Sequence, residues 1–197
     1  MSDIERFNDP IANQIDWDWI VSGGSSFQTH ELAQESNGNI RFKATGGSIT
    51  FALGFIVIPV LFSPFVFLDE MAIIPLGIFG IAGSWLLYHS LTPIVFDFEK
   101  GYFYSGRLRG NEAPWTKGLD WCKLNDIHAL QIISEYISGD RERRGFKSFE
   151  LNIVTKDAIR INVVDHGNIY ALRSHAKALG DKLGVPVWDI TLEQNEQ

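Results

Sequence analysis

Two long apolar runs dominate the hydrophobic pattern of this chain. Residues 44–68 and residues 71–96 contain no Asp, Glu, Lys or Arg, and only two acidic residues separate them. Each run exceeds the roughly 20 residues that a helix needs to cross the hydrocarbon core of a bilayer. Neither run has the polar stripe of a helix on the surface of a soluble protein. The pattern predicts two transmembrane helices, 48–68 and 71–91, that form an antiparallel hairpin.

A second interpretation of these runs is a hydrophobic helical hairpin buried in a larger soluble core. The flanking charges favour the membrane. Asp69 and Glu70 form the turn between the spans, whereas bases lie only on the outer flanks of the hairpin. They are Arg41 and Lys43 before it and Lys100, Arg107 and Arg109 after it. The positive-inside rule then predicts that both termini are cytoplasmic. The first 40 residues lack the apolar core of a signal peptide.

Small residues lie along the second apolar run. Gly77, Gly80 and Ser84 are spaced so that they can form a close-packing helix face. We expect this face to pack against the first span or against another protomer, so an oligomer is one possible outcome. It could equally dock another membrane protein, which would make the chain a structural subunit of a membrane complex.

The segments outside the apolar runs alternate in the manner of β-strands. Before the runs, alternation predicts strands at 15–21, 27–34 and 39–45, with the Asn37-Gly38 pair as a hairpin turn between the last two. After the runs, it predicts further strands at 94–98, 102–107, 126–137, 149–155 and 158–164. Glycine at position 101 and the Lys156-Asp157 pair predict two more hairpin turns.

The period then changes to that of a helix. Ile169, Leu172, Ala176, Leu179 and Leu183 form one apolar stripe, which predicts a helix near 167–183. Asp165 or Asn168 can cap its start, and Gly184 stands where a C-terminal glycine belongs. The residues that follow, 185–188, are expected to pack back as an extended tail.

These elements define a fold class and a domain plan. The class is an α+β membrane protein: a transmembrane helical hairpin plus a cytoplasmic antiparallel β domain with a C-terminal helix. About seven strands followed by one helix match a pleckstrin-homology-like (PH-like) barrel. The N-terminal strands are expected to join the later sheet, although a separate hairpin is the alternative. The plan is an N-terminal segment 1–47, a hairpin 48–93, a β domain 94–189 and a frayed tail 190–197.

Composition narrows the function classes. The chain has 197 residues, with 17 Lys and Arg against 24 Asp and Glu, and this net charge of −7 argues against nucleic-acid binding. Cys122 is the only cysteine, which excludes an internal disulfide and a cysteine-rich zinc site. Neither nucleotide-binding glycine motif is present. The sequence predicts no cofactor and no metal.

Several runs resemble a family of uncharacterised bacterial inner-membrane proteins, and the two-span layout is similar to that of bacterial PH-domain membrane proteins. The resemblance covers most of the chain and implies a bacterial inner-membrane location, but it implies no activity and no catalytic residue. The runs that carry it are 23–30 (GGSSFQTH), 127–131 (IHALQ), 160–167 (RINVVDHG) and 185–189 (VPVWD).

Candidate catalytic chemistry is sparse. Asp165-His166 is an acid beside an imidazole, and a small membrane-anchored enzyme using this pair is the alternative function. A helix cap and a pinned loop explain both residues more simply, so no catalytic residue is predicted. His30 begins a sequence one histidine short of a zinc-protease motif. His89 lies in the second span, where an ionisable group is a functional candidate.

The most informative polar feature is the segment 138–148 between two predicted strands. Its bases could bind the phosphate of an anionic lipid headgroup or an acidic protein, because guanidinium pairs with phosphate through two hydrogen bonds. These residues are Arg141, Arg143, Arg144 and Lys147. A solvated, salt-bridged tip is the alternative. The sequence thus favours a non-catalytic, membrane-anchored binding module.

Overall fold

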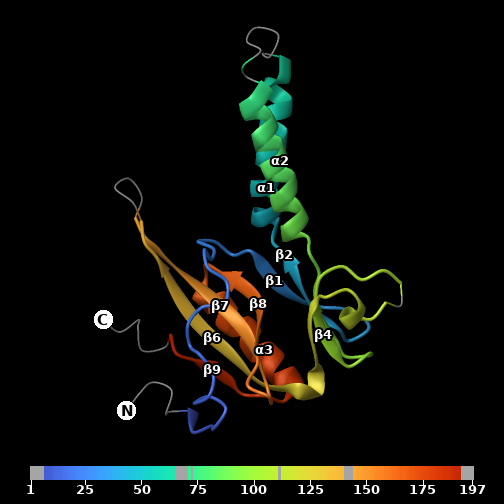
Figure 1. Cartoon of the computed structure of the whole chain (residues 1–197), viewed down its shortest axis with the longest axis vertical. Helices are drawn as coiled ribbons and strands as arrows, with labels where there is room; N and C mark the ends of the chain where they lie inside the picture. Colours follow the sequence, from blue (N-terminus) through green and yellow to red (C-terminus); the bar gives the residue numbers. More distant parts are fainter. Residues whose placement is uncertain (1–6, 65–70, 72, 111, 140–143, 192–197) are drawn as a thin grey trace. The chain divides into compact units, whose positions relative to one another are not determined.

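The computed structural model describes residues 7–64, 71, 73–110, 112–139 and 144–191 (Figure 1). The chain forms two compact units. A helical unit consists of Ala44–Thr92, and a sheet unit combines the chain before it with the chain after it. The described residues form three α-helices and two sheets that are antiparallel apart from one short strand. The predicted α+β class is confirmed at this level.

The first sheet of the sheet unit, sheet A, joins the N-terminal hairpin to the strands that follow the helical unit. Its strands lie in chain order: β1 (His30–Gln34), β2 (Ile40–Ala44), β3 (Ile94–Asp97), β4 (Tyr102–Ser105) and β5 (Asp120–Lys123). β2 and β3 pair antiparallel, with Phe42 opposite Ile94. The joint sheet is therefore present, and both ends of the helical insertion leave from adjacent strands.

The second sheet, sheet B, is built on a long hairpin. Its order is β8 (Arg160–His166), β7 (Phe146–Thr155), β6 (Ile127–Ile137) and β9 (Val187–Asp189), and β9 runs parallel to β6. β8 pairs with β7 only as far as Phe149 opposite His166, whereas β6 and β7 continue to Ile137 opposite Phe146. Among the described strands, the end of this hairpin is thus a two-stranded ribbon.

The main core of the sheet unit contains side chains from both sheets and from helix α3 (Ile169–Leu183). Phe96, Phe103, Leu151 and Leu172 are fully buried in it. The Asn168 side chain caps α3 by accepting hydrogen bonds from the N–H groups of Tyr170 and Ala171. Gly184 ends the helix with φ +71°. Asn168, not Asp165, is thus the cap.

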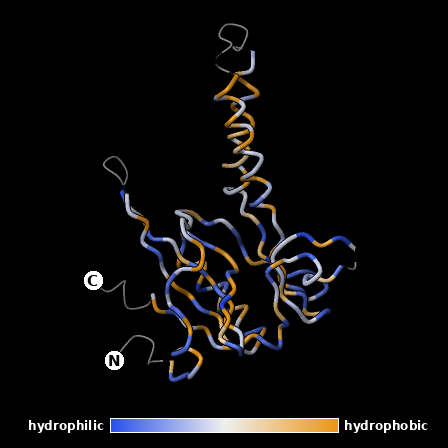
Figure 2. The backbone as a smooth tube through the Cα atoms, viewed as in Figure 1, coloured by the Kyte–Doolittle hydropathy of each residue, from blue (hydrophilic) through white to orange (hydrophobic). Residues whose placement is uncertain are grey.

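The helical unit contains α1 (Gly46–Phe62) and α2 (Ile73–Ser90). The Thr45 hydroxyl caps α1 by accepting from the Ser48 N–H. Both helices are apolar along most of their length (Figure 2). Of the helices in the described residues, α2 alone is both long and apolar enough to cross a membrane, and α1 is apolar but has 17 residues. The turn predicted at 69–70 lies outside the described residues.

Several sequence predictions agree with the structure and one is wrong. The strands expected at 27–34, 39–45, 126–137 and 149–155 correspond to β1, β2, β6 and β7. The strand expected at 15–21 is not formed. Its backbone groups bond to side chains of sheet B instead of to a neighbouring strand. The structure also contains elements that the sequence pattern did not predict: β5, the pairing of β9, and short 3₁₀ helices at Pro114–Thr116 and Leu124–Asp126.

Candidate functional site

One face of sheet B is polar although it is buried. Residues on this face alternate with core residues such as Leu130 and Leu151. Register places Gln131 opposite Asn152 and Glu135 opposite Ser148. The buried polar residues of this face on β6 and β7 are Gln131, Glu135, Ser148, Glu150 and Asn152. Buried polar groups need hydrogen-bond partners, so whatever covers this face must supply them.

The cover is an irregular N-terminal segment, residues 16–27, which we name the strap. The Ile20 and Val21 N–H groups donate to the Glu150 carboxylate at 2.9–3.1 Å. The Ser25 N–H donates to the Ser148 hydroxyl at 2.7 Å. The Gln131 side-chain amide donates to the Asp16 carbonyl at 3.1 Å. Side chains of sheet B thus supply the hydrogen-bond partners that a neighbouring strand would otherwise provide to the strap backbone.

Two glycines allow this close approach. A Cβ on Gly24 would lie 2.0 Å from the Ser148 hydroxyl oxygen. A Cβ on Gly167 would lie 2.3 Å from the backbone N of Phe27, and the Gly167 N–H donates to the Phe27 carbonyl at 2.9 Å. Both contacts are far shorter than any real Cβ makes, so glycine is required at these positions for the strap to lie where it does.

Beneath the strap the polar side chains form a connected network. The Asn152 side-chain amide donates to Glu150 at 3.1 Å and to Gln131 at 3.3 Å. The Asn162 amide donates to Asn152 at 3.3 Å and to Asp165 at 3.1 Å. The network therefore crosses three strands of sheet B, from β6 to β8.

The network brings carboxyl groups close together. The pKa of Asp165 is raised to about 6, mainly by burial and to a smaller extent by the nearby Glu150 and Glu135, against the lowering effect of the Asn162 hydrogen bond. The Glu135 Oε2 is buried without a hydrogen-bond partner among the described residues. Glu150 and Glu135 thus lie close enough to Asp165 to influence the protonation of Asp165.

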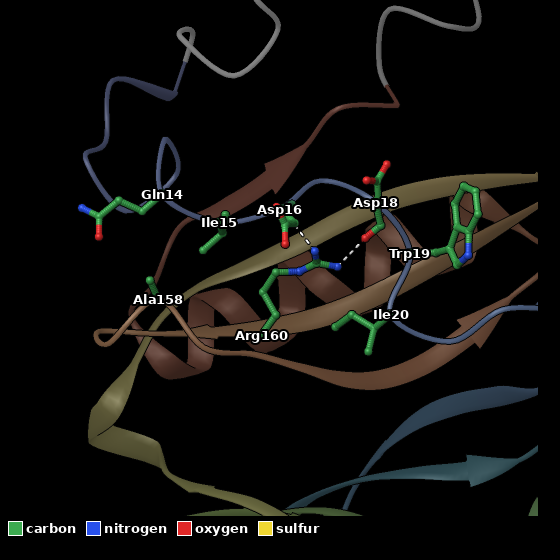
Figure 3. A pocket seen from close by; sticks show the side chains of 8 residues that line it. All are labelled: Gln14, Ile15, Asp16, Asp18, Trp19, Ile20, Ala158 and Arg160. Atoms are coloured by element: carbon green, nitrogen blue, oxygen red, sulfur yellow. Dashed lines mark hydrogen bonds between the residues drawn. The ribbon is translucent and has the colours of Figure 1, made fainter.

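A pocket of about 370 Å³ opens beside the strap (Figure 3). The Arg160 guanidinium lies in it and donates to the carbonyls of Asp16 and Asp18. Its Nε–H is buried and finds no acceptor among the described residues. The remaining lining residues are Gln14, Ile15, Trp19, Ile20 and Ala158. The guanidinium is engaged in fastening the strap, and the rim carries two exposed aspartates.

The Asp165-His166 pair does not form a dyad. The Asp165 carboxylate lies in the polar network, whereas the His166 ring packs 5.9 Å from the His175 ring on the opposite side of β8. The His166 Nε2–H donates to the His30 carbonyl, and its Nδ1 accepts from the Asn168 N–H. Burial lowers the pKa of His166. Both ring nitrogens therefore hold backbone in place.

Other candidate reactive groups are also engaged or shielded. His128 bonds to Asp9 at 2.8 Å. Burial raises the pKa of Cys122 to about 12, so its thiolate is not formed at neutral pH. Among the described residues, no group of three His, Cys, Asp or Glu side chains could hold a metal ion. The His30 segment forms strand β1, which is incompatible with a helical zinc motif.

The described residues of the basic segment, 138–139 and 144–148, adjoin the end of the β6–β7 ribbon. Arg141 and Arg143 lie outside the described residues. Arg144 and Lys147 are exposed, and Lys147 is in β7, paired with Tyr136. The described part of the segment is therefore solvent-facing, at the end of a two-stranded ribbon that reaches beyond the rest of sheet B.

In the helical unit, Gly83 makes the close contact between the helices. A Cβ there would lie 2.7 Å from the Phe55 Cβ and 3.0 Å from the Ala52 carbonyl oxygen. By contrast, a Cβ on Gly77 or Gly80 would meet nothing within 4 Å, and the Ser84 hydroxyl bonds to its own helix. The close contact of α2 with α1 therefore involves Gly83, whereas Gly77 and Gly80 have open space beside them.

Comparison with protein-family models gives no match, and comparison with curated proteins gives none either. Function must therefore be inferred from the residues and their geometry. The polar face of sheet B was missed at the sequence level. Asn152 and Glu150 at alternating positions of β7 are the one signal that could have revealed it.

Proposed function

We propose that this protein is a non-catalytic binding module anchored in a membrane by α1 and α2. The observation that carries the proposal is the outward-facing apolar surface of both helices. Val60 and Leu61 on α1 are each 65% exposed, and Ile78 and Ile81 on α2 are 62% and 74% exposed. An apolar surface of this extent marks an interaction site in a soluble protein, and it matches the hydrocarbon of a bilayer.

Helix length and strand pairing support a hairpin that enters and leaves on the same side. At 1.5 Å per residue, α1 and α2 span about 26 Å and 27 Å of the roughly 30 Å hydrocarbon core. Because β2 pairs with β3 across the insertion, both ends of the helical unit belong to one folded sheet. Since a bilayer cannot pass between paired strands, this pairing supports a topology in which both polar parts share one compartment.

The basic flanks favour the cytoplasmic side of a bacterial inner membrane. Two sheets followed by α3 are also compatible with a PH-like domain, with the membrane hairpin inserted between β2 and β3. In this proposal the sheet unit makes the functional contacts, with an anionic lipid headgroup or with another protein.

We propose a non-catalytic role because the buried polar side chains of the sheet unit hydrogen-bond to the protein backbone. Glu150, Arg160 and Gln131 bind the strap backbone, and His166 binds the backbone around His30 and Asn168. These groups therefore position chain segments and do not face a substrate.

Topology is the first test of the anchor. We expect an alkaline phosphatase fusion after Gln197 to be inactive and a fusion within the turn at 69–70 to be active, because the enzyme folds only outside the cytoplasm. The protein should also stay in the membrane pellet after alkaline carbonate washing. An active C-terminal fusion would reverse the orientation, and extraction by carbonate would contradict the anchor itself.

A further inference from the structure

Four aromatic rings form a cluster on the outer face of sheet A, which we name the aromatic platform. It consists of Tyr102 and Tyr104 of β4, Trp121 of β5 and Trp115 from the connection between them. The Trp115 ring centroid lies 5.0 Å from that of Trp121 and 5.9 Å from that of Tyr102, and the two tyrosine rings are 6.0 Å apart.

The platform faces away from the core. Phe103, between the two tyrosines, is fully buried and packs on Phe96 at 4.7 Å on the opposite face of the sheet. Tyr104 and Trp121 are opposite each other in register and are half-buried, whereas Trp115 is 55% exposed. An exposed indole above a layer of rings is unusual in a soluble sheet, because contact of its apolar area with water is unfavourable.

The connection that carries Trp115 also carries basic residues. The connection from β4 to β5, residues 106–119, carries Arg107, Arg109 and Lys117, and the Lys117 ammonium lies 3.1 Å from the Glu112 carboxylate. Trp and Tyr beside Lys and Arg is the composition that proteins use where they meet lipid headgroups, since the rings enter the interface and the cations face anionic lipid.

The connection from α2 to β3, the strand that pairs with β4, is short. Tyr104 and Trp121 lie level with Val95 in the sheet. Val95 follows Ser90, the last residue of α2, by five positions. Five extended residues reach at most about 18 Å. Tyr88 and Trp85, both exposed on the last turns of α2, are where an interfacial aromatic belt is expected.

We propose that the aromatic platform inserts into the headgroup layer of the bilayer that α1 and α2 span, with Trp115 reaching deepest. This inference rests on the proposed membrane anchor. The contact would give the sheet unit a second attachment to the membrane surface and would hold it in one orientation, so that the opposite side of the unit faces the cytoplasm.

The test uses nitroxide labels on the full chain in vesicles of phosphatidylethanolamine and phosphatidylglycerol. Lys117→Cys places a label two residues from Trp115 and retains all four rings. Trp85→Cys reports on α2, and Tyr170→Cys, at a side chain that is 76% exposed on α3, reports on a position in water. The buried Cys122 should not react, which the unmodified protein checks directly. Collisions with oxygen and with a water-soluble nickel chelate measure the depth of each label.

We expect the label at position 117 to collide more with oxygen and less with the nickel chelate than the label at position 170. Adding Trp115→Ser should shift position 117 towards the aqueous values, while the thermal midpoint shows that the fold is retained. One contrary result is a label at position 85 in lipid together with a label at position 117 that is as exposed to water as the label at position 170. The platform inference would then be wrong, while the membrane anchor would still hold. Shielding from both reagents would indicate a protein partner or a second copy and would also overturn the inference. An aqueous label at position 85 would contradict the anchor.

Discussion

The backbone N–H of Ile20 donates a bifurcated hydrogen bond to both carboxyl oxygens of Glu150, 130 residues later in the chain, at 3.0 and 3.1 Å. The buried Glu150 side chain on β7 thus accepts hydrogen bonds from the strap backbone, as a carbonyl of a neighbouring strand would in a β-sheet. Because the acceptor is a side chain, the strap crosses the sheet without extending its ladder.

Replacing Glu150 tests how strongly this contact holds the strap. Hydrogen bonds to a charged acceptor contribute about 1.5–3 kcal/mol each, so Glu150→Gln should lower the free energy of unfolding by about 2–3 kcal/mol. Urea unfolding of the detergent-solubilised chain measures this. Glu99→Gln, at an exposed turn, is the matched control. Limited proteolysis should cut the strap faster in Glu150→Gln alone, and equal behaviour of the two variants would refute a fastening role.

Asp165 should make stability depend on pH. Its folded-state pKa of about 6 lies above the ordinary value of 3.8. The stability that its proton supplies is therefore complete below the ordinary pKa and is lost as the pH rises through about 6. Asp165→Asn mimics the neutral acid, so we expect it to be more stable than the natural chain by about 2 kcal/mol at pH 8. The difference should vanish near pH 4. Denaturant midpoints measured across this range check the slope, and parallel profiles for the two proteins would contradict the assignment.

The helix pair should tolerate a methyl group at one glycine and not at another. Gly83→Ala places a carbon against Phe55 and the Ala52 carbonyl, so overpacking should cost about 1–3 kcal/mol. Gly80→Ala has open space and should stay within about 0.5 kcal/mol of the natural chain. Thermal unfolding in a mild detergent distinguishes them. A larger loss for Gly80→Ala would mean that its face packs against another helix in the native protein.

The basic segment is predicted to bind an anionic lipid or an acidic partner. Changing Arg141, Arg143, Arg144 and Lys147 to Ser should leave membrane insertion unchanged and reduce co-purification of anionic lipid or of an acidic protein. The reduction should be largest at low salt, since salt screens exposed charges. The charge-matched control changes Lys100, Lys156, Lys177 and Lys182, which are exposed elsewhere on the sheet unit. If both variants retain the same lipids and proteins at low salt, the segment is a solvated tip.

Local pattern was sufficient where an element is decided by its own residues. The period of Leu172 and Leu179 identified α3, and Gly38, Gly101 and Gly184 have the positive φ that their turns and cap require. The long apolar runs identified both helices of the helical unit, because helices satisfy their backbone within one segment.

The joining of β2 to β3 was expected from the sequence, but tertiary structure decided most other contacts between distant segments. Alternation at 15–21 predicted a strand, but the backbone there hydrogen-bonds to the side chains of Glu150 and Arg160, and Trp19 and Val21 are exposed. Asp165 and His166 are adjacent in sequence and yet face opposite sides of β8. β9 pairs with β6 only because α3 brings the chain back across the sheet. A sequence lists which groups can form hydrogen bonds, but the pairing is selected by which of them are buried together, and that is a property of the folded chain.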